Sequence, residues 1–81
     1  MNVGKRITFF RTAKNYSVNK LATLSGISQS YLRDIELGNK NPTIEILSYI
    51  CEALNISLRE FLMSRQMDNF VMIHLSLKYT A

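Results

Sequence analysis

The chain has few of the residues that small proteins use to reinforce a fold with covalent bonds or metal ions. Its 81 residues include one cysteine, Cys51, and one histidine, His74. One cysteine cannot form an intrachain disulfide, and these two residues are too few for a structural zinc site. Stability must therefore come from packed apolar side chains, and hydrophobic residues make up 47% of the sequence.

Long apolar runs are also missing. No segment approaches the ~20 apolar residues that a membrane-spanning helix needs. The first residues, MNVGKRITFF, place no long apolar stretch behind their charges, as a secretory signal would. We therefore expect a cytoplasmic protein without a membrane partner.

Residue patterns that would indicate an enzyme are absent as well. The sequence contains no recognisable paired-carboxylate site, no nucleophile placed beside a general base, no phosphate-binding glycine loop and no cluster of metal ligands. We therefore expect neither catalysis nor a bound cofactor or metal ion.

Positive charge is present and unevenly distributed. The net charge is +4, and residues 1–40 hold seven Lys or Arg against two acids, whereas residues 41–81 hold three against four. A basic half favours a polyanion such as nucleic acid as partner, although +4 alone is better explained by an ordinary solvated surface. Lys5, Arg6 and Lys14 are accordingly expected on a charged face toward solvent.

Apolar spacing and capping residues predict five short helices and no strand before residue 66. The helices are expected at residues 2–14, 17–25, 28–37, 44–54 and 57–64. The expected N-caps are Ser17, Ser28, Thr43 and Ser57, and Gly26 and Gly38 are expected just past the second and third helices. The apolar stripe of the fourth helix would comprise Ile44, Leu47, Ile50, Cys51 and Leu54. On that stripe Cys51 is expected to be a small core residue rather than a redox sensor.

The last residues follow a different pattern. Apolar side chains alternate through residues 70–79, which favours a strand. A lone strand on a helical domain needs a partner, and the simplest partner is the same strand of a second chain. A sixth helix that folds back on the bundle is the alternative. We therefore divide the chain into a helical domain, 1–64, and a C-terminal tail, 65–81, that serves in dimerisation.

The second and third helices flank Gly26 in a helix-turn-helix arrangement. Each is too short to be stable alone, and the arrangement holds the second helix of the pair out so that its first residues can reach base edges in a major groove. The outward face of that helix carries side chains able to hydrogen-bond: Ser28, Gln29, Ser30, Arg33 and Asp34.

Several short motifs occur together in an order that resembles the Xre-type helix-turn-helix regulators, the family of lambda repressor and Cro. They are Leu21-Ala22, Gly26 to Ser28, Ser30 to Leu32, Ile35-Glu36 with Gly38, and NPTIEIL from Asn41 to Leu47. The similarity extends over residues 3–64, and it is strongest to short repressors of the SinR kind and to controller proteins of restriction–modification systems.

The resemblance implies an all-α, five-helix domain that binds double-stranded DNA as a homodimer at an inverted repeat. It places base contacts on Gln29, Ser30, Arg33 and Asp34. It places contacts to the DNA backbone on Ser17, Val18, Asn19, Ser28, Tyr31, Asn39, Lys40 and Asn41. It also implies an internal ion pair between Arg11 and Glu36, and we assign the dimer surface to Tyr49, Phe61, Val71, Ile73, Leu75 and Leu77.

Two of these residues depart from the usual pattern. Val18 stands where many members have Gln, so only its backbone N–H can bind a phosphate. Asp34 is acidic on a helix that faces DNA, where it either accepts from a cytosine amino group or orients Arg33 or Lys40. The second role is favoured because an unpaired carboxylate near phosphates is costly.

The resulting expectation is a sequence-specific transcriptional regulator, most simply a repressor. The alternative is a protein-interaction module, such as an antitoxin or the target of an anti-repressor, that keeps the fold and binds a regulatory protein through its tail. The apolar tail favours the protein-interaction module, and the polar face of the third helix favours the transcriptional regulator.

Overall fold

The computed structural model describes residues 2–63, which form five helices. They are α1 (Val3–Ala13), α2 (Val18–Ser25), α3 (Gln29–Glu36), α4 (Ile44–Ala53) and α5 (Leu58–Met63). The expected all-α, five-helix architecture is confirmed, and each helix end lies within one residue of its expected position. The tail, its predicted strand, His74 and the dimer residues Val71, Ile73, Leu75 and Leu77 lie outside the described residues.

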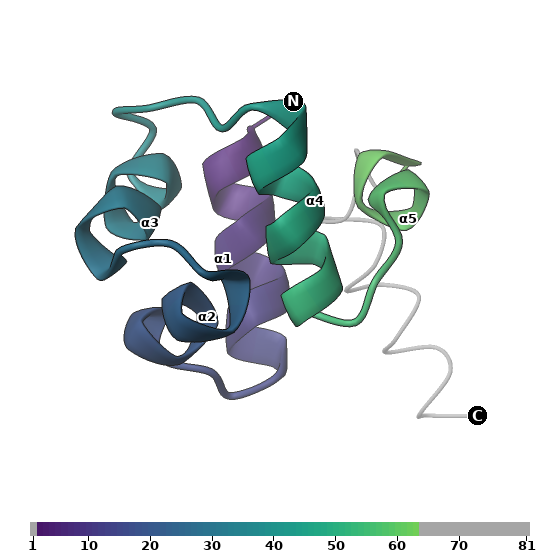
Figure 1. The fold of residues 1–81 in the computed structure, drawn as a ribbon. Coiled ribbons are helices and arrows are strands. Elements are labelled where there is room, and N and C mark those ends of the chain that lie inside the picture. Colours follow the sequence, from purple (N-terminus) through teal and green to yellow (C-terminus); the bar gives the residue numbers. More distant parts are fainter. Residues whose placement is uncertain (1, 64–81) are drawn as a thin grey trace.

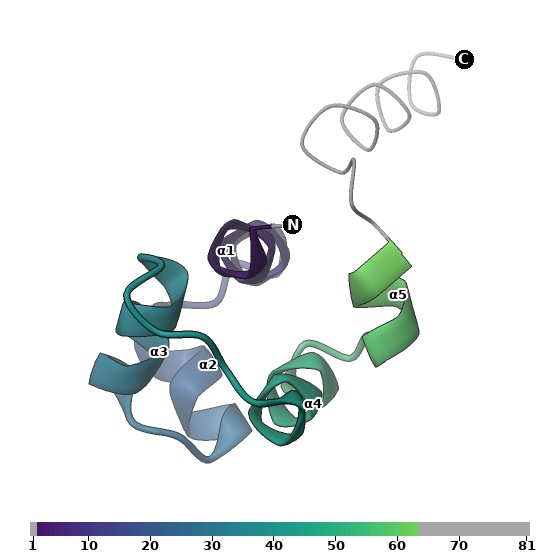
Figure 2. The same ribbon diagram turned by 90° about the horizontal axis from the view of Figure 1, so that it is seen from above.

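The helices form a small bundle (Figure 1), in which α1 and α4 lie on opposite sides when seen from above (Figure 2). Helices α2 and α3 pack on one side of this pair and α5 lies on the other, as the view from above also shows (Figure 2). The helix pairs that pack most extensively are α2 with α4, α1 with α3, α2 with α3, and α4 with α5. Helix α3 therefore lies at the edge of the bundle, where it is supported from behind by α1 and α2.

Each helix begins at a side chain that accepts a hydrogen bond from the backbone N–H three residues later. These caps are Asn2, Ser17, Ser28, Thr43 and Ser57, with distances between 2.9 and 3.1 Å. The four caps that the sequence predicted are thus confirmed, and Asn2 adds a fifth. Such caps matter here because helices of two to three turns have few internal hydrogen bonds to stabilise them.

One kind of turn joins three of the four helix pairs. A residue with left-handed backbone ends the first helix, a half-buried apolar residue follows, and a serine caps the next helix. The three examples are Asn15-Tyr16-Ser17, Gly26-Ile27-Ser28 and Asn55-Ile56-Ser57. In each, the apolar residue donates its N–H to the carbonyl five residues earlier, which closes the helix end. The sequence predicted this geometry at Gly26 and not at the two asparagines.

The core lies where the five helices meet. It comprises Ile7, Leu21, Ala22, Leu32, Ile35, Leu47, Ile50, Cys51, Leu54 and Phe61, all at most 4% exposed. Ile44 does not belong to it, contrary to the expected stripe, because the first residue of α4 projects beyond the bundle and is 65% exposed. Phe61 is fully buried against Phe10, so its assignment to a dimer surface was wrong.

Arg6 is also placed differently from the expectation of a solvent-facing charge. It is 4% exposed, and its Nη1 donates to the carbonyl oxygens of Phe61 at 3.0 Å and Leu62 at 3.4 Å. A guanidinium is well suited to the last carbonyls of a helix, which have no partner within the helix and carry the negative end of its dipole. Arg6 therefore ties α1 to the end of α5.

Within residues 2–63, no helix has the length and apolar character needed to cross a membrane.

Candidate nucleic-acid interface

The position of α3 is set first by a close backbone contact with α1. A Cβ added to Gly4 would lie 2.4 Å from the carbonyl oxygen of Ile35 and 2.6 Å from that of Glu36. No side chain fits in that space, so glycine permits the start of α1 to lie directly against the end of α3. This role of Gly4 was not predicted from the sequence.

A hydrogen-bond network continues the same contact along α1. Arg11 donates to both carboxylate oxygens of Glu36, at 2.8 and 3.0 Å, and Thr8 donates its hydroxyl to Glu36 Oε1 at 2.9 Å. A third Arg11 nitrogen donates to the carbonyl of Tyr16 at 2.9 Å, in the turn before α2. The ion pair lies where the resemblance implied it, and Thr8 is an additional member. Together these bonds fix the end of α3 against α1 and the α1–α2 turn.

One face of the first half of α3 is presented to solvent. Gln29, Ser30 and Arg33 are exposed, whereas Leu32 and Ile35 on the opposite face are buried. The three helices that begin after a capping serine can be compared at their first residue. In α2 and α5 this residue is apolar, Val18 and Leu58, and it packs against the core. In α3 that residue is Gln29, which is exposed. Of these three helix starts, α3 alone places an amide there, which suits recognition of another surface.

At the start of α2, the groups best placed to bind a phosphate are backbone N–H groups rather than side chains. Ser17 is exposed, and its hydroxyl is occupied by the N–H of Lys20. Val18 is half-buried against the core, and Asn19 is exposed. The first N–H groups of a helix have no acceptor within the helix, and they attract anions. Ser28 is exposed in the same way at the start of α3.

A small polar cluster follows at the other end of α3. Lys40 Nζ lies 3.8 Å from Asp34 Oδ2 and 5.7 Å from the centre of the Tyr31 ring. Within the described residues, the Asp34 carboxylate pairs with Lys40 and not with Arg33. Asn39, Lys40 and Asn41 are exposed in the loop that follows α3, and Tyr31 is half-buried.

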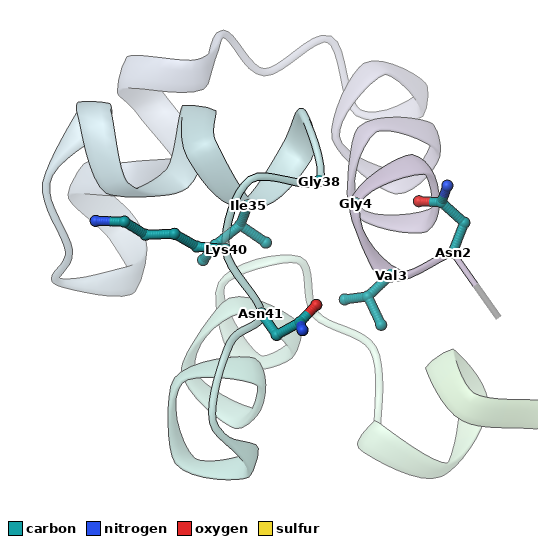
Figure 3. A pocket seen from close by; sticks show the side chains of 7 residues that line it. All are labelled: Asn2, Val3, Gly4, Ile35, Gly38, Lys40 and Asn41. Carbon is teal, nitrogen blue, oxygen red and sulfur yellow. The ribbon is translucent and has the colours of Figure 1, made fainter.

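A shallow pocket lies between this loop and the start of α1. Its lining residues are Asn2, Val3, Gly4, Ile35, Gly38, Lys40 and Asn41 (Figure 3). The Lys40 side chain runs along α3 and points its ammonium group away from Asn2 and Val3 (Figure 3). The pocket therefore lacks a cation directed inward, and no three His, Cys, Asp or Glu side chains in residues 2–63 lie close enough together to hold a metal ion.

Two other residues that the sequence singled out lie away from α3. Tyr49 is 45% exposed on α4, so it remains available for a contact between subunits. Cys51 is 2% exposed, and burial raises the pKa of its thiol to about 11. A thiol with that pKa is protonated at neutral pH and unreactive, as expected of a core residue.

Gly4, Thr8 and Arg6 are the structurally important residues that sequence reasoning missed. Gly4, Thr8 and Arg11 are separated by four and three residues, so they lie on one face of α1. That spacing was a usable signal, because a glycine inside a helix is unfavourable unless another chain segment approaches closely. Arg6 offered no comparable signal in the sequence.

The family match agrees with this geometry. A helix-turn-helix family profile matches residues 9–61, which are more than half of the chain. The chain is 41% identical over 59 residues to the HTH-type transcriptional regulator SlrR of Bacillus subtilis (strain 168), which covers 72% of this chain and 39% of SlrR. It is 36% identical over 61 residues to SinR of the same organism, which covers 74% of this chain and 55% of SinR. The chain thus spans about half or less of these two relatives.

Solved structures show the same arrangement of helices. The restriction–modification controller protein C.AhdI from Aeromonas hydrophila matches with a TM-score of 0.72 and 37% identity, over 74% of this chain and 91% of that chain. SinR in complex with DNA matches with a TM-score of 0.69 and 36% identity, over 74% of this chain and 97% of that chain. A SinR/SinI protein complex matches with a TM-score of 0.70 and 29% identity, over 90% of this chain and 78% of that chain.

The five-helix bundle, the turn at Gly26 and the outward polar face of α3 are thus accompanied by a family match over most of the same residues. These findings confirm the resemblance inferred from the short motifs. The chain belongs to the Xre-type helix-turn-helix family.

Proposed function

We propose that the chain is a sequence-specific DNA-binding transcriptional regulator that acts as a homodimeric repressor. In this proposal α3 enters the major groove, with Gln29, Ser30, Arg33 and Asp34 toward the bases. Contacts to phosphates come from Ser17, Val18, Asn19, Ser28 and Tyr31, and from Asn39, Lys40 and Asn41 in the loop after α3. The observation that carries the proposal is the exposed polar start of α3 on a helix that is otherwise anchored in the core.

The chemistry of these side chains supports base reading. An exposed Gln can bond adenine N6 and N7 together, and an exposed Arg can bond guanine O6 and N7. Both lie in the first turn and a half of α3, the part of a recognition helix that reaches base edges. The relative solved in complex with DNA has the same fold at 36% identity, which gives DNA binding by this fold a precedent.

A homodimer follows from the small size of the reading surface. One α3 helix reads only a few base pairs, whereas two of them ~34 Å apart on one DNA face read an inverted repeat. We assign the subunit contact to Tyr49 and to residues 65–81, including Val71, Ile73, Leu75 and Leu77, and we exclude the buried Phe61. Deleting residues 66–81 should weaken dimerisation and leave the helical domain, 1–64, folded. A deleted chain that sediments as the same dimer would contradict the assignment.

A second candidate is a module whose main partner is another protein. It is supported by the match to a SinR/SinI protein complex. In this case a regulatory protein binds the tail or the dimer surface, and the DNA contacts are secondary. The two candidates differ in whether the purified chain selects a DNA sequence by itself.

The deciding experiment is selection from a random duplex pool by the purified full chain at near-physiological salt. We expect an enriched inverted repeat with half-sites about ten base pairs apart. Weak, salt-sensitive binding without an enriched sequence would favour the protein-interaction module.

A matched pair of arginine variants then tests the role of α3. Arg33→Ala should relax the preference at one base pair per half-site and cost about 1–3 kcal/mol of specific binding. Arg59→Ala removes the same charge from an exposed position on α5 and should leave the preference intact. Equal losses on selected and random DNA for Arg33→Ala would count against base reading.

A further inference from the structure

The backbone of the loop after α3 is bonded to the helix end, and the Lys40 side chain lies along α3. The backbone carbonyl of Asp34 accepts from the N–H of Asn39 at 2.9 Å and from that of Lys40 at 3.3 Å, which brings the loop back onto the helix end. The Lys40 ammonium then lies 3.8 Å from the Asp34 carboxylate and 5.7 Å from the centre of the Tyr31 ring. Figure 3 shows the side chain extended along α3. Its charge therefore lies beside the proposed reading surface.

This ion pair is solvent-accessible and weak. The Lys40 side chain is 57% exposed and that of Asp34 is 38% exposed, and their charged atoms are beyond hydrogen-bond distance. Pairs of this kind contribute little to stability, because water solvates both charges when they separate. The pair can consequently exchange partners at little cost to the fold, unlike the Arg11–Glu36 pair, whose side chains are 14% and 9% exposed.

On DNA, the phosphates compete with the Asp34 carboxylate for the Lys40 ammonium. If Lys40 moves to a phosphate, Asp34 is left as an unpaired carboxylate in the field of a polyanion, which is unfavourable. A carboxylate in the major groove is compensated by an amino group, which cytosine N4 and adenine N6 supply; cytosine N4 is the usual partner of acidic side chains, because the N7 acceptor beside adenine N6 repels a carboxylate. Purine N7, guanine O6 and thymine O4 are acceptors and repel it.

We propose that Asp34 and Lys40 exchange partners on DNA and thereby couple base reading to backbone binding. At a site that presents cytosine to Asp34, the carboxylate accepts from N4 and Lys40 binds a phosphate. At any other sequence, Lys40 stays with Asp34 and contributes no phosphate contact. Asp34 is then a specificity residue that acts largely by suppressing binding to wrong sequences, an inference that rests on the DNA-binding function proposed above.

The exchange predicts a specific pattern of salt dependence. Each phosphate that a protein neutralises on duplex DNA changes the slope of log affinity against log salt by ~0.9. In Asp34→Asn, Lys40 is free on all DNA, so the slope on random duplex should steepen by ~0.9 per chain and the affinity for random duplex should rise. The cytosine preference should weaken as well, because the Asn amide also donates and so tolerates base acceptors that repel a carboxylate. In Lys40→Gln, the slope should fall by the same amount on the selected site only.

Two variants serve as matched controls. Glu45→Gln removes one exposed acid from α4, and Lys14→Gln removes one exposed base from the end of α1. Neither residue belongs to the α3 cluster, so each should affect selected and random duplex alike. Thermal melting of all four variants checks that the fold is kept, as their exposure leads us to expect.

The measurement is titration of selected and random duplexes with each full-length variant at several salt concentrations. The inference is overturned if Asp34→Asn shifts both duplexes equally, as Glu45→Gln does, or if Lys40→Gln flattens both slopes. A wild-type chain that selects no sequence would instead overturn the proposed function, and the exchange with it. Selective wild-type binding with unchanged slopes in the variants would remove the exchange alone.

Discussion

Gly4 on α1 lies directly against the carbonyl oxygen of Ile35 on α3, at a distance that leaves no room for a side-chain carbon. The contact is between backbone and backbone, so neither partner can move aside by changing a rotamer. It determines how closely the proposed recognition helix approaches the rest of the domain. Its consequences can be measured without any DNA.

Gly4→Ala should destabilise the fold, although a glycine-to-alanine change inside a helix ordinarily stabilises it by up to ~1 kcal/mol. The added Cβ would be 2.4 Å from Ile35 O, so α1 and α3 must separate. We expect a loss of about 1–3 kcal/mol in urea unfolding. Thr12→Ala, an exposed change on the same helix, should stay within about 0.5 kcal/mol of wild type. A Gly4→Ala protein as stable as wild type would show that the two helices are not in contact at this point.

Glu36→Gln should destabilise the protein because it leaves the Arg11 guanidinium without a counter-charge in a largely buried setting. Thr8 and Arg11 both donate to this carboxylate, so a single change weakens several bonds. The expected loss is about 3 kcal/mol in the free energy of unfolding. Asp34→Asn, which breaks the exposed pair, should cost less than about 1 kcal/mol. Equal effects of the two changes would mean that burial does not distinguish the pairs.

Asn15 and Asn55 both have φ of 59° at the ends of α1 and α4, where most side chains are strained. Replacing either with Ala should cost about 1 kcal/mol, because a Cβ without a polar side chain is disfavoured in this conformation. Replacing either with Gly should be close to neutral. Thermal melting of the four single variants tests this. Similar melting temperatures for the Ala and Gly forms would argue against the left-handed turn.

The Cys51 thiol should react slowly while the protein is folded. Burial raises its pKa from 9.0 to about 11, so at pH 8 the reactive thiolate is about a hundredfold rarer than in the unfolded chain. The same shift affects stability. Because the folded state holds the thiol proton more tightly, the contribution of Cys51 to the free energy of unfolding is complete below pH 9 and is lost as the pH rises toward 11. Labelling with a thiol reagent at pH 8, with and without urea, measures the difference. Fast labelling of the folded protein would place the thiol at the surface.

The secondary structure was predictable because its signals are local. Apolar spacing and a serine or threonine at each start are enough to define α2 to α5 within one residue. The turns at Asn15 and Asn55 match the turn at Gly26, but they were not predicted, because asparagine indicates left-handed backbone less clearly than glycine does. The family resemblance then supplied the Arg11–Glu36 pair, which local patterns alone do not predict.

What the sequence did not reveal depends on contacts between distant segments. Arg6 is one of several basic residues near the start, and only the folded structure shows that the last carbonyls of α5 meet it. Ile44 and Phe61 both fit helical periodicity, yet one projects beyond the core and the other fills it. Periodicity gives the face of a helix but not how far along its length the neighbouring helices extend.

The repeated turns also determine where the chain can change in length. In the three turns of left-handed residue, apolar residue and serine, one inserted residue would disrupt the spacing between the hydrogen bond that closes the first helix and the serine that caps the next. In the remaining connection, from Leu37 to Thr43, Asn39 and Lys40 bond the Asp34 carbonyl, but the compact three-residue spacing of the other turns is absent between Lys40 and the capping threonine. Insertions, peptide tags and natural length differences should therefore be compatible with folding in this loop alone among the connections of residues 2–63. Extra residues would thus be tolerated beside the proposed DNA-binding surface and would disturb the fold in the three other turns.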